Sequence, residues 1–363
     1  MKRKKRKILL YYLLFLLTAT GIYCLYAVLY RGKTEPDSQA PTTDTSAAVY
    51  TFSQFSQIAG ENAILEEYGI QYYDHSPVSD TYIIPGLNGT RTCSPAGEPA
   101  SCTSMTPQGL AVTEDYLFIS AYCHTRQHNS VLYMIDKHSH TFIKEIILPG
   151  RNHAGGLAYD PIHRNLWVSG RERGVAQANY YSLEALENYS YEEYHAPLEY
   201  TEKYFLYGIT RDSFLAYYDH ALYVGFFTTD ADSVIEKFAI SSDGGLVETL
   251  DREWGLNMRV PVAEDISMIS GKAQGIAFRD DQLLISQSYG IFPSQLRIFD
   301  HLSASSLRDP HATWSFSFPC QMEQIYVDGN ALYLLFESAS YSYRAYVPTV
   351  IDRVIKISLD FIP

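Results

Sequence analysis

The sequence predicts an all-β fold, and three observations support this. Short apolar runs separated by tight polar turns recur along most of the chain, which is the pattern of antiparallel strands. Tyrosine, a good strand former, occurs 31 times. Similar segments also recur at intervals, among them AGGLAYDPIHRNLWVSG (154–170) and AQGIAFRDDQLLISQ (273–287). The repetition predicts one structural unit that is used several times.

The repeats predict a ring of sheets. Each repeat of roughly 50 residues holds four apolar runs joined by turns, the signature of a β-propeller blade. The fifth repeat ends without its fourth strand, and DTYIIPGLN (80–88) has the character of that missing strand. We therefore predict a five-bladed β-propeller over 80–363, closed by pairing of 82–87 with 353–359, which leaves only short, protected sheet edges. The alternative is a sixth blade within 50–79.

Two blades illustrate the strands that we expect. In the second blade, strands at 156–159 and 165–169 precede a tyrosine-rich pair between 176 and 204. In the third, the strands are predicted at 214–217, 221–226, 233–241 and 246–250. The tyrosine-rich segment is interpreted as an ordinary outer pair of strands, and an exposed tyrosine patch for a protein partner is the alternative.

The unit, with its pattern xGIAxDxxxxxLYVS followed by xVxxIDxxTxKxxxTI, resembles blades of bacterial propellers with surface-layer-type YVTN, NHL or lactonase-like repeats. The resemblance covers about 80–363 and implies the fold and an extracytoplasmic location. It implies no single function, since the group contains enzymes, binding modules and scaffolds.

The lactonase-like members hold calcium on the channel with a Glu, Asn and Asp set. The matching positions here carry one carboxylate, which argues against that calcium site because hard cations need several oxygen ligands. No motif of the five-bladed glutaminyl-cyclase type is present either. The matching positions are Gln108, Gly155, Ser213, Gln274 and Glu323.

The amino terminus predicts a membrane anchor. Residues 1–7 form a basic tail, and residues 8–30 are uncharged and mostly apolar, long enough as a helix to span a bilayer. A cleaved signal peptide is the alternative, but TAT at 18–20 is a poor cleavage site. The basic end is expected to stay in the cytoplasm, so the remainder faces outward as a single-pass membrane protein. Residues 31–50 are predicted as a flexible linker and 51–79 as an extension packing on the propeller.

Charge and cysteines restrict the partners. The net charge is −13, and the exported part is more acidic because residues 2–7 are all basic. Such a field disfavours nucleic acid and anionic surfaces. Cys24 lies in the predicted anchor, and an even number of exported cysteines predicts two disulfides, with three connectivities open. The pairing we favour joins Cys93 to Cys102 and Cys123 to Cys320.

Propeller geometry predicts where a ligand binds. The residues before each G-[LI]-A and after each second strand should gather at one mouth of the central channel. They offer imidazoles, amides, carboxylates and a guanidinium, a set suited to a sugar, a peptide end or a cation. Satisfying strand-end backbone groups and channel water is the alternative role. The predicted mouth residues are Gln108, His124, His128, His153, Arg171, Gln274, Gln287, Glu323 and Glu337.

No metal site or cofactor is predicted, with a channel-bound cation such as calcium as the alternative. His124 and His128 could bind zinc only with a cysteine that a disulfide would otherwise use. HSH (138–140) is expected at a hairpin tip, and DAD (230–232) lacks the spacing of a calcium loop. No G-x-S-x-G elbow and no Gly-rich phosphate loop occurs.

Without catalytic spacing, a binding role is favoured over an enzyme. We expect a membrane-anchored scaffold that presents the mouth to an envelope protein, peptide or glycan. The alternative is a hydrolase or lyase, of the lactonase-like kind, acting on a small molecule at the same mouth. A third hypothesis is an assembly subunit that uses the sides of its blades.

Overall fold

A computed structural model describes residues 42–51, 78–209, 211, 213–250, 258–300 and 306–361. All of them belong to one compact unit, Pro41–Pro363. The predicted anchor, the basic tail and most of the predicted 51–79 extension lie outside the described residues. Within the described part of the chain, no helix is both long and apolar enough to traverse a bilayer.

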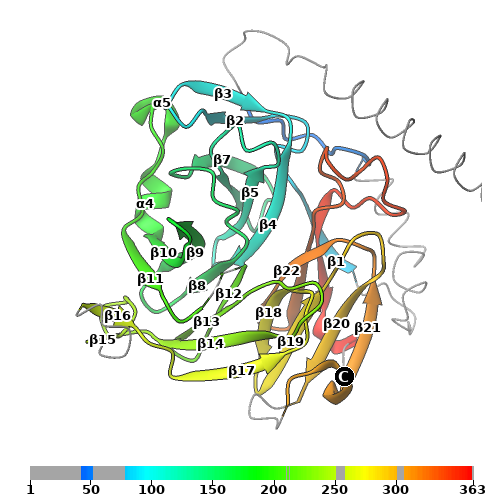
Figure 1. The fold of residues 1–363 in the computed structure, drawn as a ribbon. Helices are drawn as coiled ribbons and strands as arrows, with labels where there is room; N and C mark the ends of the chain where they lie inside the picture. Colours follow the sequence, from blue (N-terminus) through cyan, green and yellow to red (C-terminus); the bar gives the residue numbers. More distant parts are fainter. Residues whose placement is uncertain are drawn as a thin grey trace, which may run out of the picture. The chain divides into compact units, whose positions relative to one another are not determined.

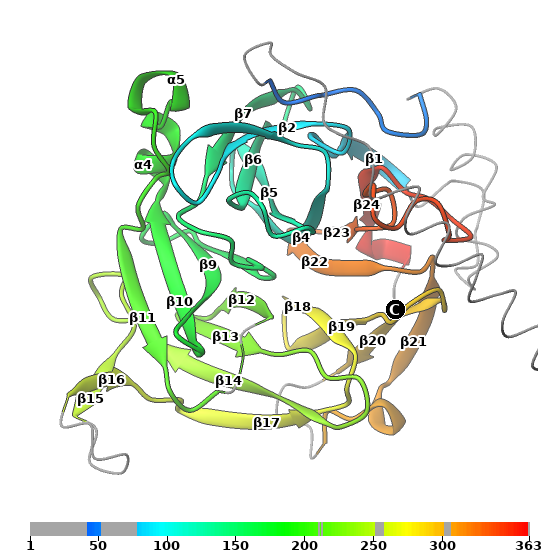
Figure 2. The same ribbon diagram turned by 45° about the horizontal axis from the view of Figure 1, so that its top comes forward.

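The described residues form a five-bladed propeller, as the repeats predicted. Five four-stranded antiparallel sheets surround a common centre, with β12, β18 and β22 near the middle and β11, β17 and β21 at the periphery (Figure 2). Each innermost strand contacts the innermost strands of the two neighbouring sheets, in the cyclic order β4, β8, β12, β18 and β22. That unbroken cycle closes the ring.

The first two sheets follow the repeats closely (Figure 1). From the centre outward, the first contains β4 (Met105–Val112), β5 (Tyr116–Cys123), β6 (Val131–Asp136) and β7 (Phe142–Ile147). The second contains β8 (Leu157–Asp160), β9 (Asn165–Glu172), β10 (Val175–Ser182) and β11 (Glu202–Leu206).

The tyrosine-rich segment of the second sheet forms two short helices between its outer strands. They are α4 (Leu183–Asn188), capped by the Ser182 hydroxyl, and α5 (Tyr191–Tyr194). Tyr181 and Tyr189 are buried, and Tyr194 is exposed. The segment therefore contributes to the core, and the broad exposed tyrosine patch considered from the sequence does not form there.

The third sheet departs from the prediction in its outer strand. It contains β12 (Phe214–Tyr218), β13 (Ala221–Gly225), β14 (Ser233–Ala239) and, outermost, β17 (Asp265–Ile269). The segment 246–250, predicted as the fourth strand, instead supplies β15 (Glu248–Leu250), which pairs with β16 (Arg259–Pro261) in a separate hairpin. The prediction failed because the segment 246–250 is the first apolar run after β14, whereas the outer strand, which carries Ile266 and Met268, follows the intervening hairpin.

The last two sheets complete the ring. The fourth contains β18 (Ala273–Arg279), β19 (Gln282–Gln287), β20 (Ser294–Phe299) and β21 (Trp314–Phe318). The fifth contains β22 (Met322–Asp328), β23 (Ala331–Phe336), β24 (Arg353–Ser358) and β1 (Val78–Ile83). A further hairpin, β2 (Thr90–Cys93) with β3 (Pro99–Cys102), precedes the first sheet, and short 3-10 turns lie at Asp309–His311 and Leu359–Phe361.

The amino-terminal strand closes the propeller. β1 pairs antiparallel with β24, with Tyr82 opposite Val354 and Ile83 opposite Arg353. The predicted closure is confirmed, although the strand begins and ends about four residues earlier than the 82–87 segment predicted from sequence. The fifth sheet is therefore built from both ends of the domain.

The glycine and serine of each repeat have a clear structural role. A Cβ on Gly275 would lie 2.7 Å from Cα of Gln324 in the next sheet, so only glycine allows this approach of inner strands. The Ser120 hydroxyl accepts from Gly109 N and donates to Ala154 O of the following blade. Ser286 likewise donates to Glu323 O at 2.8 Å. The repeated small residues thus tie each blade to the next.

The core lies between adjacent sheets. Trp167 of the second sheet clusters with Leu215 and Leu222 of the third, and Leu296 of the fourth clusters with Leu334 of the fifth. Burying apolar area between blades is what stabilises the ring.

Residues 42–51, at the end of the predicted linker, lie against the propeller. Asp44 exchanges backbone hydrogen bonds with Gly86 and Gly89. The Asp352 carboxylate accepts from the backbone N–H groups of Val49 and Tyr50, each at 2.9 Å. This segment is therefore held near the closure of the fifth sheet.

Candidate functional site

One end of the central channel opens into a cavity of about 650 Å³. It is formed by the ends of strands and the loops of all five sheets, as the repeat geometry suggested. Six of the nine predicted mouth residues line it, namely Gln108, His153, Arg171, Gln274, Glu323 and Glu337. Whether this cavity binds a ligand remains a prediction.

The other three predicted residues lie elsewhere. His124 is beside the cavity wall, with Nδ1 3.3 Å from the Tyr122 hydroxyl. Gln287 turns onto the side of the fourth sheet, where its amide donates to Asp309 and accepts from Arg297. His128 is nearly buried and points toward Cys123. Strand ends alone do not determine side-chain direction, so the sequence could not separate these three from the rest.

Two buried carboxyl groups lie in the cavity wall. Glu323 belongs to β22 and is 3% exposed, and Glu337 directly follows β23. The Gln108 amide donates to Glu337 Oε2 at 2.8 Å and to Pro107 O at 2.8 Å. Burial raises the pKa of Glu337 to about 8, although the Gln108 hydrogen bond opposes this. Burial and the neighbouring Glu337 charge raise the pKa of Glu323 well above its usual range. The pair therefore carries at most one negative charge at neutral pH.

An aromatic wall stands beside the carboxyl pair. The rings of Tyr122 and His153 lie 4.2 Å apart between centroids, and the Arg126 guanidinium lies 4.9 Å from the Tyr122 ring. Loss of hydration within the cavity and the charge of Arg126 lower the pKa of His153 to about 4. His153 is therefore neutral at physiological pH and acts as a hydrogen-bonding and stacking group.

Guanidinium groups make the cavity positive. Arg126, Arg171 and Arg211 all line it, and none of them forms an ion pair with a carboxylate of the described residues. Three positive charges thus face at most one negative charge from Glu323 and Glu337. The negative net charge of the chain predicted that it disfavours anionic partners. The three guanidinium groups give this cavity a locally positive field, which attracts them.

Several lining residues were missed from sequence. Arg126 lies within CHTRQH, a stretch already considered for its histidines. Tyr122 is the next-to-last residue of β5, the strand that leads into this stretch. Arg211 and Tyr343 come from long connections with no repeat pattern. A search for charged and aromatic residues in every loop after a second strand would have found Arg126 and Tyr343, but nothing in the sequence points to Arg211.

Gln324 closes the centre of the ring below the cavity. Its side-chain oxygen accepts from Leu110 N at 3.0 Å and Leu157 N at 2.8 Å. Its nitrogen donates to Leu157 O at 2.5 Å and Leu215 O at 3.0 Å. Four sheets are therefore joined by one amide. Gln324 also lines a second hollow, at the opposite ends of the inner strands, whereas its neighbour Glu323 lines the mouth cavity.

The predicted disulfides are wrong. Cys93, Cys102, Cys123 and Cys320 are all buried free thiols. Cys102 lies close to Cys123 and His128. Spacing along the chain could not reveal this neighbour, because the β2–β3 hairpin folds back toward the end of β5.

Comparisons with known proteins find only distant structural similarity. No protein-family model and no curated protein matches the chain. Hydrazine synthase from Kuenenia stuttgartiensis is 11% identical, with a TM-score of 0.35, and the match covers 63% of this chain and 55% of that one. A functionally unknown protein from Desulfotomaculum acetoxidans is 11% identical, with a TM-score of 0.38 and coverage of 70% and 71%.

A periplasmic gluconolactonase from Pseudomonas aeruginosa is also 11% identical, with a TM-score of 0.33 and coverage of 64% and 61%. The chain thus spans less than two thirds of the hydrazine synthase and gluconolactonase chains. Similarity at this level says nothing about activity, because a fold does not determine function.

Proposed function

We propose that this chain is a binding module whose mouth cavity holds a carboxylate-bearing polar ligand, of the acidic-sugar type. We further propose that residues 8–30 tether the propeller to the outer face of a membrane. The ligand would then be a glycan of the cell envelope.

The observation that supports this proposal most strongly is the set of three guanidinium groups, of Arg126, Arg171 and Arg211, that line the cavity without an ion-pair partner among the described carboxylates. A guanidinium presents a planar fork of donors that matches the two oxygens of a carboxylate. Arg171 belongs to the second blade and Arg211 to the connection to the third, and both line the same cavity. The low charge of the Glu323–Glu337 pair leaves this attraction largely uncancelled.

The rest of the lining favours a sugar over a simple anion. Amide groups of Asn152 and Gln274 can exchange hydrogen bonds with hydroxyl groups. The half-buried rings of Phe227 and Tyr343 offer apolar surface to a ligand. A ligand with one carboxylate, several hydroxyl groups and an apolar ring face would use all three kinds of contact.

Calorimetric titration of the full chain tests this proposal. A galacturonic-acid trisaccharide should bind, and a neutral galactose trisaccharide of the same size should not. Raising the salt concentration should weaken the binding, because the charges are exposed to solvent. Arg171→Ala and Arg211→Ala should each weaken binding by about 10- to 100-fold, the cost of a hydrogen bond to a charged group.

Arg173→Ala is the matched control, since Arg173 is an exposed arginine two residues after Arg171, in the turn between β9 and β10, and does not line the cavity. Equal binding of the acidic and neutral sugars, or equal losses for Arg171→Ala and Arg173→Ala, would contradict the proposal.

A second candidate function is acid–base catalysis at the same cavity. One observation favours it: a buried carboxyl pair that retains a proton at neutral pH includes both a proton donor and a proton acceptor. Incubation of the galacturonate trisaccharide with the chain, followed by mass spectrometry, separates the two functions. Shortened or unsaturated products that disappear in Glu337→Gln would favour an enzyme, and an intact ligand favours the binding module.

A further inference from the structure

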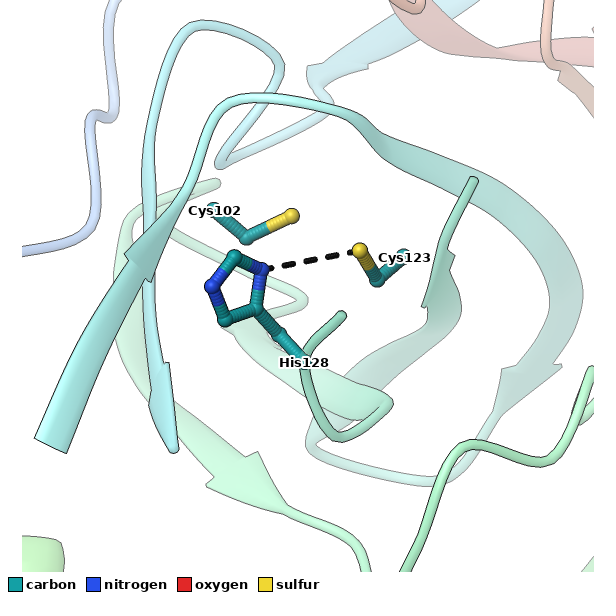
Figure 3. A group of neighbouring side chains, drawn as sticks. All are labelled: Cys102, Cys123 and His128. Atoms are coloured by element: carbon teal, nitrogen blue, oxygen red, sulfur yellow. Dashed lines mark hydrogen bonds between the residues drawn. The ribbon is translucent and has the colours of Figure 1, made fainter. Parts of the chain in front are cut away.

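A second cluster of chemically reactive side chains lies beside the mouth (Figure 3). It joins Cys102 at the end of β3, Cys123 at the end of β5 and His128 in the loop that follows β5. The two sulfur atoms and a ring nitrogen of His128 all lie within 4.8 Å of one another. Among the described residues, this is the one group of three or more His, Cys, Asp or Glu side chains with that spacing.

We propose that Cys102, Cys123 and His128 form a binding site for a zinc ion. Two thiolates and an imidazole are preferred zinc ligands, whereas calcium and magnesium require oxygen. The sequence offered His124 and His128 as a zinc pair. The structure instead brings Cys102 to His128 and directs His124 toward Tyr122.

The spacing agrees with the geometry of bound zinc. Bonds of about 2.3 Å to sulfur and about 2.05 Å to nitrogen, at a tetrahedral angle, separate the two ligand atoms by about 3.6 Å. The distance from Cys123 Sγ to His128 Nδ1 is 3.6 Å. Two sulfurs on the same ion would be about 3.8 Å apart, within the limit that the cluster satisfies.

The surroundings suit thiolate ligands. Cys102 and Cys123 are 0% and 1% exposed, and His128 is 9% exposed. The Ser104 hydroxyl lies 3.5 Å from Cys102 Sγ and 3.7 Å from Cys123 Sγ, and the Thr125 hydroxyl lies 3.1 Å from Cys123 Sγ. Hydroxyl groups that hydrogen-bond sulfur orient a metal ligand, and a water can supply the fourth position.

The site would have a structural role. It joins the β2–β3 hairpin to the loop between β5 and β6, and the same loop carries Arg126 of the mouth cavity. Backbone bonding between Asn129 N and Cys93 O already links the two segments. A zinc ion would fasten the hairpin over the loop and hold the cavity wall in place.

Metal titration of the full chain tests the site. Protein stripped of metal and kept reduced should bind one zinc per chain. Cobalt(II) in its place should give the intense visible absorption of a tetrahedral thiolate complex. Cys102→Ser, Cys123→Ser and His128→Gln should each weaken zinc binding by more than about 100-fold, beyond the 10- to 100-fold cost of losing an outer-shell partner.

Cys93→Ser and Cys320→Ser are matched controls, because each removes a buried free thiol outside the cluster. X-ray absorption of the zinc-loaded wild-type chain provides a measurement that needs no variant, and it should report two sulfur ligands and at least one nitrogen. The proposal is overturned if the reduced chain binds no zinc, if the control variants lose as much metal as the cluster variants, or if Cys102 and Cys123 form a disulfide that persists with zinc present.

Discussion

Gln324 and Leu157 exchange two hydrogen bonds across the centre of the ring, one to the Leu157 nitrogen at 2.8 Å and one to its oxygen at 2.5 Å. The two residues belong to the fifth and second sheets, which are not neighbours in the ring. The same amide also binds Leu110 and Leu215. One side chain of β22 therefore hydrogen-bonds the inner strands of the first three sheets.

Gln324→Leu tests this central amide. The substitution keeps the size of the side chain but leaves four buried backbone groups without their partner, at about 1–3 kcal/mol for each group that stays unsatisfied. We expect the free energy of unfolding to fall by about 3–6 kcal/mol, measured by urea denaturation. Gln127→Leu, at an exposed position, is the control. A loss no larger than that of the control would show that the amide is dispensable.

Tyr82→Ala tests the closure of the ring. Tyr82 is 1% exposed, its ring lies 6.1 Å from that of Tyr333, and its hydroxyl donates to Lys137 O. Removing a buried aromatic side chain costs about 3–5 kcal/mol. Thermal unfolding should show that loss, and limited proteolysis should cut near β1 first. Tyr346→Ala, at an exposed tyrosine, should change neither; unchanged protease resistance in Tyr82→Ala would argue against closure by this strand.

The buried carboxyl pair predicts a pH dependence of stability. A carboxyl group whose pKa is raised in the folded state binds its proton more tightly there than in the unfolded chain. The contribution of protonated Glu337 to the stability of the fold is complete below pH 4.5, the ordinary pKa of a glutamate. It is lost as the pH rises through about 8, the pKa of Glu337 in the folded chain. The free energy of unfolding should therefore fall across that window, by up to about 1.4 kcal/mol per pH unit for each proton.

Glu337→Gln should reduce this fall, because the amide cannot ionise and Glu323 is the one member of the pair that still loses a proton. Denaturation at several pH values measures the slope, with the exposed Glu98→Gln as control. A wild-type slope that survives in Glu337→Gln would mean that other groups produce it.

The segment 42–51 depends on Asp352. This carboxylate is fully buried beside the Arg353 guanidinium, and Arg353 also donates to Tyr50 O at 2.7 Å. Asp352→Ala removes the charge next to a buried cation, which costs about 3–5 kcal/mol. We expect that loss together with faster proteolysis within 42–51, whereas Asp230→Ala at an exposed site should have little effect. Unaltered cleavage would show that the segment is held by other contacts.

The fold was predictable because the repeats report strand pairing directly. Each G-[LI]-A marks an inner strand that packs too closely on the next sheet to allow a side chain, and the nearly continuous apolar runs of the second and third strands follow from burial on both faces. β17 escaped prediction because a nearer apolar run, 246–250, took its place in the sequence. The segment that contains β15 was predicted as a blade strand because its pattern identifies a strand. The pattern does not identify the partner of that strand, which is β16 of the separate hairpin.

The candidate site was predictable only in part, for a different reason. Strand ends place a residue near the mouth, but the direction of its side chain depends on its register, which is why Gln274 lines the cavity and Gln287 does not. The arginines that make the cavity positive come from connections without a repeat. Neighbours such as Cys102 and Cys123 meet through a hairpin whose orientation no local pattern encodes.

A crystal structure of the chain soaked with the galacturonate trisaccharide tests the central claim most directly. The account predicts a carboxylate of the sugar within hydrogen-bonding distance of Arg171 or Arg211, with a sugar ring against Phe227 or Tyr343. Sugar bound elsewhere on the propeller, or an empty cavity under conditions where binding is measured in solution, would contradict it.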